Sequence, residues 1–429
     1  MEPLALLGGT PVLSQPLPPY QAFGPEAMEA VTAVMQGGCL SGFYGSWGDQ
    51  FFGGPMVRAL EEAWRERFEV QHAIAVNSAT SGLSAAMGAI GLNPGDEVII
   101  PPYTMSATAM APLLYGGIPV FADIEPHTFC LDPQAVRQAI TPRTRAILAV
   151  NLFGHPAPLA DLMALAREHG LYLVEDNAQA PLAMHNGHYT GTLGHIGVFS
   201  LNYHKHIQAG EGGICVTNDA TLAQRLQLIR NHGENVVAEL GLEHTANLIG
   251  FNYRMPELSA AIALTQLQHS AHHVCQRIQL AQRLTEGVMT LPGLRPPLVR
   301  PGCRHVYYVW ALRYDASVLG VSRQLLSQAL AAEGFPHFTG YVRPLYMLPV
   351  FQQRLAFGNQ GYPFNLSSVQ YTPGMCPVAE QMYAEELLGY ETCAYAVDEA
   401  QAARLVAALH KVYAHGDRLA RLEQGRAVA

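Results

Sequence analysis

A lysine, a carboxylate and a hydroxyl-rich turn are the residues of this sequence whose types and positions favour one common chemistry. Lys205 lies in SLNYHKHIQAGEGGICVTND, between two apolar runs and beside a glycine-rich turn. Asp176 ends the apolar run LYLVED. Burial lowers the pKa of an amine and makes it a nucleophile toward carbonyl carbon. A carboxylate at the end of a buried strand can hold a cationic ring nitrogen through a charge-assisted hydrogen bond.

The hydroxyl-rich turn consists of Ser78, Ala79 and Thr80, which join the run HAIAVN to the helical pattern SGLSAAMGAI. Free N–H groups at a helix N-terminus, together with two hydroxyls, form a pocket for an anion such as phosphate. An amine, an acid and a phosphate pocket are what pyridoxal phosphate (PLP) requires of a protein. The combination predicts an aminotransferase in which the lysine, once released, carries the proton.

Each of these features also has an ordinary structural interpretation. Asp176 is suited to a turn or a helix cap, and Ser78 or Thr80 to plain N-capping. A single lysine in a loop, such as Lys205, is usually a solvated charge. Its apolar and aromatic neighbours and the nearby glycines favour the chemical interpretation here.

The elements that must position these residues alternate between strand and helix patterns up to about residue 232, which indicates an α/β fold with a mainly parallel sheet. A helix is predicted over 55–68, another from about Thr80, and a third from about Leu222. The predicted strands are 72–77, 96–102, 119–124, 146–152, 171–176, 195–201 and 212–218.

The remainder of the chain predicts a bridge to a smaller α+β domain. After an irregular stretch at 233–256, a long helix should begin at Pro256, a favoured first helical position. A strand at 305–314, a helix at 322–333 and a final helix at 399–413 follow, with a long loop region from Phe335 to Pro377. We therefore expect a PLP-binding domain over 1–255 with an N-terminal arm, and a second unit over 256–429.

Composition excludes several classes of protein. The chain of 429 residues has a formal net charge of −9 and no basic block, which disfavours nucleic acid as a partner. It lacks an apolar run of membrane-spanning length and a basic N-terminal start, so neither a membrane span nor a signal peptide is predicted. Seven dispersed cysteines indicate free thiols in the cytoplasm. The histidine pairs 204/206 and 272/273 have no partner at a metal-ligand spacing, so no metal is predicted.

Seven segments of the chain, in order and in register, resemble the DegT/DnrJ/EryC1/StrS group of sugar aminotransferases, which have the type I aminotransferase fold. They are NSATSGL (77–83), GDEVIIPPYTMSATA (95–109), GGIPVFADIEPHTFCLDP (116–133), VNLFGHPA (150–157), LVEDNAQA (173–180), FSLNYHKHIQAGEGGICVTND (199–219) and GFNYRMPELSAAIALTQL (250–267). The resemblance covers nearly the whole chain, and its most specific part is the lysine placed shortly before the GEGG run.

The resemblance implies a role for individual residues. Lys205 corresponds to the Schiff-base lysine and Asp176 to the partner of the pyridine nitrogen. Gln179 corresponds to a residue that contacts the ring. The residues that correspond to phosphate ligands are Ala79, Thr80, Ser200 and, donated by a neighbouring subunit, Asn252. The resemblance thus implies a homodimer with a shared active site.

The sequence departs from the family pattern in two places. Met105 stands where the family often has an aromatic residue over the cofactor, so either Met105 or Tyr103 is expected to cover the ring. His204 and His206 flank the lysine. In a minority branch a histidine replaces the lysine and the enzyme deoxygenates a sugar. The lysine is present here, so we interpret both histidines as neighbours.

The expected reaction moves an amino group from an amino acid, glutamine or glutamate, to a ketone of a sugar, cyclitol or similar polar compound in two half-reactions. Candidate groups for the donor carboxylate are Arg254, Arg304 and Arg343, and candidate hydroxyl-reading groups are Tyr341, Tyr346 and His337. Two alternatives stay open at this point. One is a dehydratase that uses PLP or pyridoxamine phosphate, and the other is a non-catalytic regulator with the same fold.

Overall fold

The computed structural model describes residues 2–428, and its centre is a seven-stranded sheet. In spatial order the strands are β1 (His72–Val76), β9 (Gly213–Thr217), β8 (Ile196–Ser200), β5 (Tyr172–Asp176), β4 (Thr144–Val150), β2 (Glu97–Ile100) and β3 (Ile118–Phe121). β9 is antiparallel to both of its neighbours, and the other pairs are parallel. The expected α/β fold with a mainly parallel sheet is confirmed.

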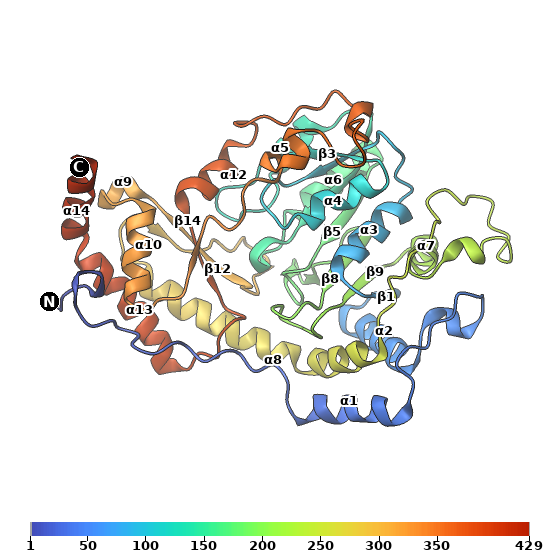
Figure 1. The fold of residues 1–429 in the computed structure, drawn as a ribbon, viewed down its shortest axis with the longest axis horizontal. Coiled ribbons are helices and arrows are strands. Elements are labelled where there is room, and N and C mark those ends of the chain that lie inside the picture. The colour runs from blue at the N-terminus through green and yellow to red at the C-terminus, as the bar shows by residue number, and fades with distance from the viewer. Residues whose placement is uncertain (1, 429) are drawn as a thin grey trace.

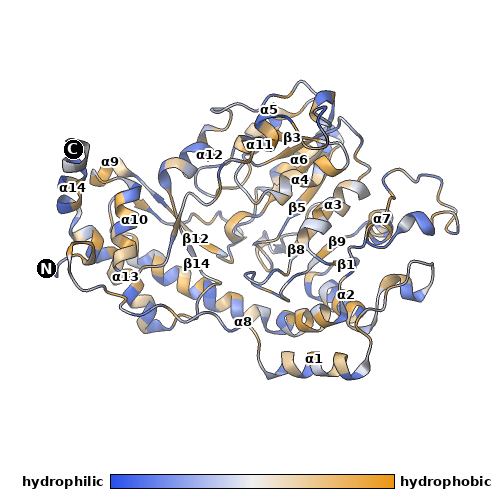
Figure 2. Cartoon of the chain, viewed as in Figure 1, coloured by the Kyte–Doolittle hydropathy of each residue, from blue (hydrophilic) through white to orange (hydrophobic). Residues whose placement is uncertain are grey.

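Helices cover both faces of this sheet because its central strands are apolar on both sides. The helices of the first half are α1 (Pro25–Gly37), α2 (Pro55–Phe68), α3 (Ala79–Ala89), α4 (Ala107–Leu114), α5 (Pro133–Ala139), α6 (Leu159–His169) and α7 (Ala220–Arg230). In β1 the side chains alternate: Ala73 and Ala75 share a core with α2, whereas Ile74 and Val76 share one with α3. Figure 2 shows the strands as mostly hydrophobic.

The long helix α8 (Glu257–Val288) runs from the large sheet to a second, four-stranded sheet (Figure 1). That sheet has the order β10 (Leu294–Arg295), β12 (Val309–Tyr314), β14 (Leu387–Glu391) and β13 (Phe338–Thr339). The helices that follow α8 are α9 (Ala316–Leu319), α10 (Arg323–Ala332), α11 (Pro349–Gln352), α12 (Pro377–Gln381), α13 (Glu399–Ala414) and α14 (Gly416–Val428). A small third sheet joins β6 (Met184–His185), β7 (His188–Tyr189) and β11 (Cys303–Arg304).

Several predicted boundaries in this half were wrong. Pro256 has an extended ψ of 150° and occupies the N-cap of α8, so helical geometry begins one residue later. The predicted strand 305–314 is ordered as a strand only from Val309, because the residues before it turn through Tyr307 at a φ of 51°. The helix predicted as final, α13, is followed by α14, whose two glycines and few apolar residues make its helical pattern weak.

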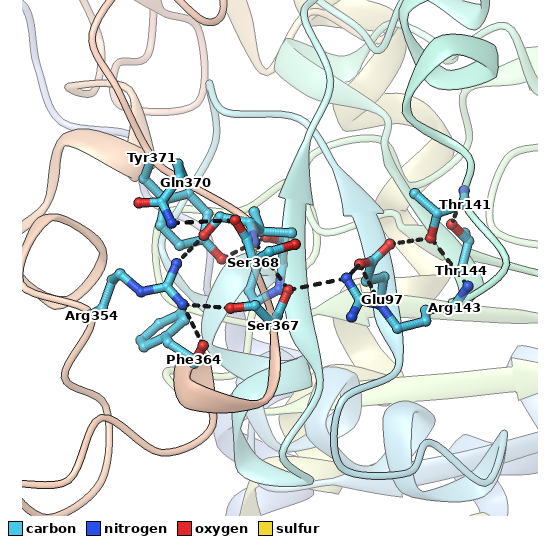
Figure 3. Close-up of polar contacts among 12 residues, drawn as sticks. Glu97, Thr141, Arg143, Thr144, Arg354, Phe364, Ser367, Ser368, Gln370 and Tyr371 are labelled. Carbon is cyan, nitrogen blue, oxygen red and sulfur yellow. Dashed lines mark hydrogen bonds and ion pairs between the residues drawn. The ribbon is translucent and has the colours of Figure 1, made fainter.

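The segment predicted as one long loop, Phe335 to Pro377, contains β13, α11 and two short 3-10 helices. Arg354 fixes it internally by donating to the backbone oxygens of Phe364, Ser367 and Val369 (Figure 3). Ser367 in turn accepts a 3.4 Å hydrogen bond from Arg143 beside the large sheet. The segment is therefore attached to the edge where β2 and β4 begin.

The hydrophobic cores do not follow one division of the sequence. Leu4, Leu13 and Leu17 of the N-terminal arm pack in the core of the four-stranded sheet. Phe351 and Tyr371 pack in the core of the large sheet. The boundary at residue 255 stays a prediction, since segments on each side of it contribute to the core of the other.

Candidate active site

A cavity of about 340 Å³ lies where β4, β5 and β8 end and where the chain leaves β1. Eight of the predicted residues line it: Ser78, Ala79, Thr80, Met105, Asp176, Gln179, Ser200 and Lys205. The carboxyl ends of parallel strands meet at one edge of a sheet, which is why segments distant in sequence converge here. The opposite wall comes from the second half of the chain, with Tyr308, Tyr341, Val342 and Glu391.

Asp176 is the last residue of β5 and is only 5% exposed. Its carboxylate accepts hydrogen bonds from the Thr108 hydroxyl at 2.9 Å and from the Ala178 N–H at 3.1 Å. Burial raises the pKa of this carboxyl, while the two hydrogen bonds and the charge of Lys205 oppose that change. These contacts fix the orientation of the carboxylate and leave acceptor capacity toward the cavity.

Lys205 lies in the turn after β8, where its backbone N–H donates to the Asn202 carbonyl at 2.9 Å. Its Nζ lies 4.3 Å from the centre of the Tyr308 ring, a cation–π contact. Burial lowers the pKa of the amine to about 8, and the carboxylates of Asp176 and Glu391 limit the shift. About a tenth of the amine is thus uncharged at pH 7, and this uncharged form is the nucleophile.

The anion-binding end of the cavity is the N-terminus of α3. Ser78 caps the helix, and its Oγ accepts from the Ser81 N–H at 3.0 Å. The first N–H groups of a helix have no intrahelical partner, so those of Ala79 and Thr80 are suited to an anion. Gly213 in β9 presses against this turn: a Cβ there would lie 2.6 Å from the Ala79 nitrogen. A glycine at 213 therefore permits the sheet and the helix end to approach.

Gln179 is held from both ends at the cavity wall. Its Oε1 accepts from the Phe153 N–H at 2.7 Å, and its Nε2 donates to the Tyr341 hydroxyl at 2.9 Å. Tyr341 was one of the candidate hydroxyl-reading groups, and it lines the cavity. The side-chain amide therefore connects the large sheet to the segment after β13.

Met105 lines the cavity and is 59% exposed. Tyr103 is fully buried, and its hydroxyl donates to the Gly340 carbonyl at 2.7 Å. The ring of Tyr103 packs edge-on against Tyr341 at 5.9 Å. Of the two residues considered as ring covers, only Met105 has access to the cavity.

Asn252 is exposed and Arg254 is half-buried, and neither residue lines the cavity. The Asn252 carbonyl accepts from the Asn77 amide at 3.2 Å, and Arg254 donates to the Asn231 side chain at 2.8 Å. Both therefore contribute to the loop beside the site without lining this chain's own cavity.

Other candidates for substrate recognition also lie outside the cavity. The Tyr346 hydroxyl is bound to Glu380, and both ring nitrogens of His337 are used by Ser327 Oγ and the Phe335 carbonyl. Arg304 and Arg343 are exposed and absent from the lining. His204 lines the cavity, where burial lowers its pKa to about 4. Within residues 2–428 no group of three potential metal ligands is found.

The structure adds three residues that the sequence pattern did not single out: Thr108, Tyr308 and Glu391. Thr108 orients Asp176, and Tyr308 contacts Lys205. Glu391 ends β14 and enters the cavity wall from the second sheet. Thr108 lay within a quoted family segment, but nothing local in the sequence distinguishes the other two, because only the folded chain brings them to the site.

A sequence model of the DegT/DnrJ/EryC1/StrS aminotransferase family matches residues 28–409. The chain belongs to this family. It is 34% identical over 427 residues to the L-glutamine:2-deoxy-scyllo-inosose aminotransferase of Micromonospora echinospora, covering 97% of this chain and 99% of the relative. It is 31% identical to the spore coat polysaccharide biosynthesis protein SpsC of Bacillus subtilis, covering 79% of this chain and 86% of the relative.

Solved structures agree with this assignment. DesI, determined in the presence of its TDP-sugar product, has a TM-score of 0.82 and 30% identity, covering 98% of this chain and 99% of that one. DesV of S. venezuelae, in complex with a ketimine intermediate, has a TM-score of 0.77 and 30% identity, covering 90% and 94%. The chain is therefore an enzyme, a PLP-dependent aminotransferase, as the sequence predicted.

The cavity suits this cofactor. It presents an anion-binding helix end, a buried carboxylate and a lysine of lowered pKa, the groups needed for a phosphate, a ring nitrogen and an aldehyde. None of the helices formed by residues 2–428 has the length and hydrophobicity to cross a membrane.

Proposed function

We propose that Lys205 and Asp176 are the catalytic residues of this aminotransferase, and that it aminates a ketone on a polyhydroxylated ring with glutamine or glutamate as donor. The observation that carries this proposal is their entry into one cavity, from two strand ends, beside the N-terminus of α3. When bound, PLP supplies an aldehyde that accepts the amino group and a ring that withdraws electrons.

The residues divide the work by position. The carboxylate of Asp176, held by Thr108 and Ala178, keeps a proton on the ring nitrogen. Lys205 holds the cofactor through Nζ and, when released, moves a proton to and from the substrate carbon. Its pKa of about 8 suits both tasks near neutral pH.

The remaining predicted residues bind and orient. Ala79 and Thr80 donate backbone N–H groups to the phosphate, and the hydroxyls of Ser78, Thr80 and Ser200 add to them. Gln179, fixed by Phe153 and Tyr341, would contact the cofactor ring, and Met105 would cover the side of the ring that faces the cavity opening. The soft, flexible side chain of Met105 leaves more room than an aromatic ring.

The choice of donor and acceptor is supported by the relatives. The enzyme of Micromonospora echinospora and a relative in Streptomyces kanamyceticus are both named for glutamine and 2-deoxy-scyllo-inosose. The nearly full-length match to the first of them supports the same donor and a similar cyclitol ketone for this chain.

The function is tested by separating its two halves. The purified enzyme should show a visible absorption band that L-glutamine or L-glutamate removes and that 2-deoxy-scyllo-inosose restores, with an aminated cyclitol as product by mass spectrometry. A band that no amino acid changes would rule out the proposed donor half-reaction.

We further propose that the enzyme is a homodimer in the cytoplasm and that Asn252 completes the partner's site. Asn252 pairs with Asn231, which also binds the carbonyl of Tyr44. Tyr44 and Ile249 are 61% and 71% exposed, which favours their burial against another subunit. All seven cysteines are free thiols, in keeping with a reducing compartment.

Mixed dimers test the shared site. Lys205→Ala and Asn252→Asp chains, each inactive or strongly impaired alone, are unfolded together and refolded. If Asn252 acts across the interface, each mixed dimer has one intact site, and about half of the chain pairs recover one active site by random assortment. No recovery, with mixed dimers verified by native mass spectrometry, would place Asn252 in its own chain's site.

A further inference from the structure

A second cavity of about 340 Å³ adjoins the candidate active site. It is lined by Pro336, His337, Phe338, Tyr341, Glu391 and Tyr395. Tyr341 and Glu391 line both cavities, so they stand at the boundary between them. If the reacting carbon of an acceptor ring lies beside Lys205, the rest of the ring extends toward these two side chains.

Glu391 provides a carboxylate at this boundary. It is the last residue of β14, opposite Val309 in the register, and it is exposed. Among the described residues, none forms a hydrogen bond or an ion pair with its side chain. Its carboxylate raises the pKa of Lys205 and that of Tyr341, because it lies close enough to both to favour their protonated forms. A free acceptor is thus available beside the substrate path.

Tyr341 supplies a fixed hydroxyl at the same place. Its oxygen accepts from Gln179 Nε2, so its own hydrogen is available to donate. The ring is held edge-on by Phe153 at 4.9 Å and Tyr103 at 5.9 Å. His337 adds only its ring surface, since both of its nitrogens are already used.

The charges around the two cavities disfavour a phosphorylated acceptor. Of the described residues that line them, Lys205 carries the cationic side chain, whereas Asp176, Glu211 and Glu391 carry carboxylates. Glu211 accepts a hydrogen bond from the Asn202 side chain at 2.8 Å. A diphosphate group in the outer cavity would meet Glu391 without an arginine in this wall to offset the repulsion.

We propose that Glu391 selects the acceptor: it accepts a hydrogen bond from a hydroxyl or an ammonium group of a ring that carries no phosphate, and it repels nucleotide-linked sugars. The inference rests on the proposed function, because it assigns the acceptor of the same site. Tyr341 donates to a second polar atom of the ring, and the two side chains together orient the ketone toward Lys205.

The first experiment uses the purified PLP-loaded enzyme and three acceptors: 2-deoxy-scyllo-inosose, 3-amino-2,3-dideoxy-scyllo-inosose and a TDP-4-keto-sugar. The donor half-reaction with glutamine is followed first, by loss of the visible band. If it fails, the proposed function fails and the acceptor question is not reached. If it proceeds, the two cyclitols should exceed the nucleotide sugar in kcat/KM by about tenfold or more.

The second experiment tests the residue. Glu391→Gln should raise the KM for the cyclitols by about three- to tenfold and lower that for the TDP-sugar, with a smaller change in the KM for glutamine. Glu391→Asp should retain the preference. Glu399→Gln, a carboxylate on α13 that is 83% exposed and paired with Arg283, is the matched control and should leave all acceptor KM values unchanged.

The two cyclitols also identify which substrate group donates the hydrogen bond to Glu391. A larger loss for the amino derivative in Glu391→Gln assigns an ammonium group, and equal losses assign a hydroxyl. Preference of the wild-type enzyme for the TDP-sugar, or identical acceptor KM values in wild type and Glu391→Gln, would overturn the proposal while leaving the aminotransferase intact.

Discussion

Two polar regions at opposite ends of the large sheet are built in different ways. Where β2 and β4 begin, Glu97 is fully buried and accepts from Arg143 Nε at 3.0 Å and Nη2 at 2.7 Å, and Arg354 donates to three backbone oxygens nearby (Figure 3). Where the strands end, Asp176, Lys205 and Glu391 converge on a cavity with hydrogen-bonding capacity left over. The first region uses its polar groups for attachment, and the second keeps them for a ligand.

Two neighbouring carboxylates on β5 show the same contrast at closer range. Glu175 is fully buried and accepts four hydrogen bonds, from Asn151 at 3.1 Å and from the N–H groups of Gly191, Leu193 and Gly194 at 2.6, 2.8 and 2.6 Å. Asp176, on the opposite face of the strand, accepts from Thr108 and Ala178 and faces the cavity. Burial raises the pKa of both, so what separates their roles is the number of partners already in place.

The largest expected effect is at the amine of Lys205, in the region where the strands end. Lys205→Ala should reduce glutamine-dependent amination by about a thousandfold or more, because the nucleophile and proton carrier are both lost. Steady-state kinetics on the PLP-loaded variant measure this. The thermal midpoint should stay near that of the wild type, and a turnover within tenfold of wild type would contradict the assigned role.

Asp176→Asn should lower kcat by about a hundredfold, since an amide cannot keep a proton on the ring nitrogen as a carboxylate does. Its unfolding free energy without cofactor should change by less than about 1 kcal/mol, because the buried charge removed was only partly compensated. Urea titration measures the unfolding free energy and initial rates measure kcat, so together they separate the effect on stability from the effect on catalysis. A large stability loss with normal kcat would make Asp176 a structural residue.

Glu175→Gln should have the opposite effect: a large loss of stability with little change in activity. An amide presents one oxygen and an NH2 group to four N–H donors, so the folded state should lose about 3 kcal/mol. The activity of the molecules that remain folded should stay within a few-fold of wild type. Equilibrium unfolding in urea measures the loss, and comparison with Asp176→Asn controls for removing a charge from the same strand.

The pH dependence of cofactor loading sharpens the contrast further. The folded pKa of Lys205 is lowered to about 8, so the reactive uncharged amine increases as pH rises through 8. The loading rate of the apoenzyme should rise about tenfold per pH unit below that value and level off above it. Asp176→Asn should move the midpoint lower, because the carboxylate raises the pKa of the amine. Stopped-flow absorbance measures both midpoints; a midpoint near 10 in the wild type would contradict the burial argument.

The smallest effect is expected in the region where β2 and β4 begin. Glu97→Gln should cost about 1 to 2 kcal/mol of unfolding free energy, since it breaks the bond to Arg143, which is 45% exposed and partly screened. Activity should not change. Ser367→Ala, which removes only the 3.4 Å contact from Arg143, is the control and should cost less. An altered acceptor KM in Glu97→Gln would show that the two ends of the sheet are coupled.

Local patterns in the sequence account for much of the fold. Apolar runs placed all seven strands of the large sheet, and Ser78, one of the two N-cap candidates, caps α3, which begins one residue before the expected Thr80. Boundaries were less accurate where tertiary contacts decide them, as at Val309, where the strand begins only when β14 is alongside. The segment after Phe335 gave no clear pattern because its short elements are fixed by contacts such as those of Arg354.

The sequence by itself determined the family, the cofactor and a cavity lined by Lys205, Asp176 and the turn at 78–80, because strand ends and helix starts are local features whose positions a parallel sheet brings to one edge. Only the tertiary structure decided the opposite wall. Tyr308, Tyr341 and Glu391 reach the cavity from a sheet more than a hundred residues later in the chain, and their side chains acquire their surroundings only when the two sheets pack together. A site formed between distant segments has no local signature, and that is where we propose that the acceptor is selected.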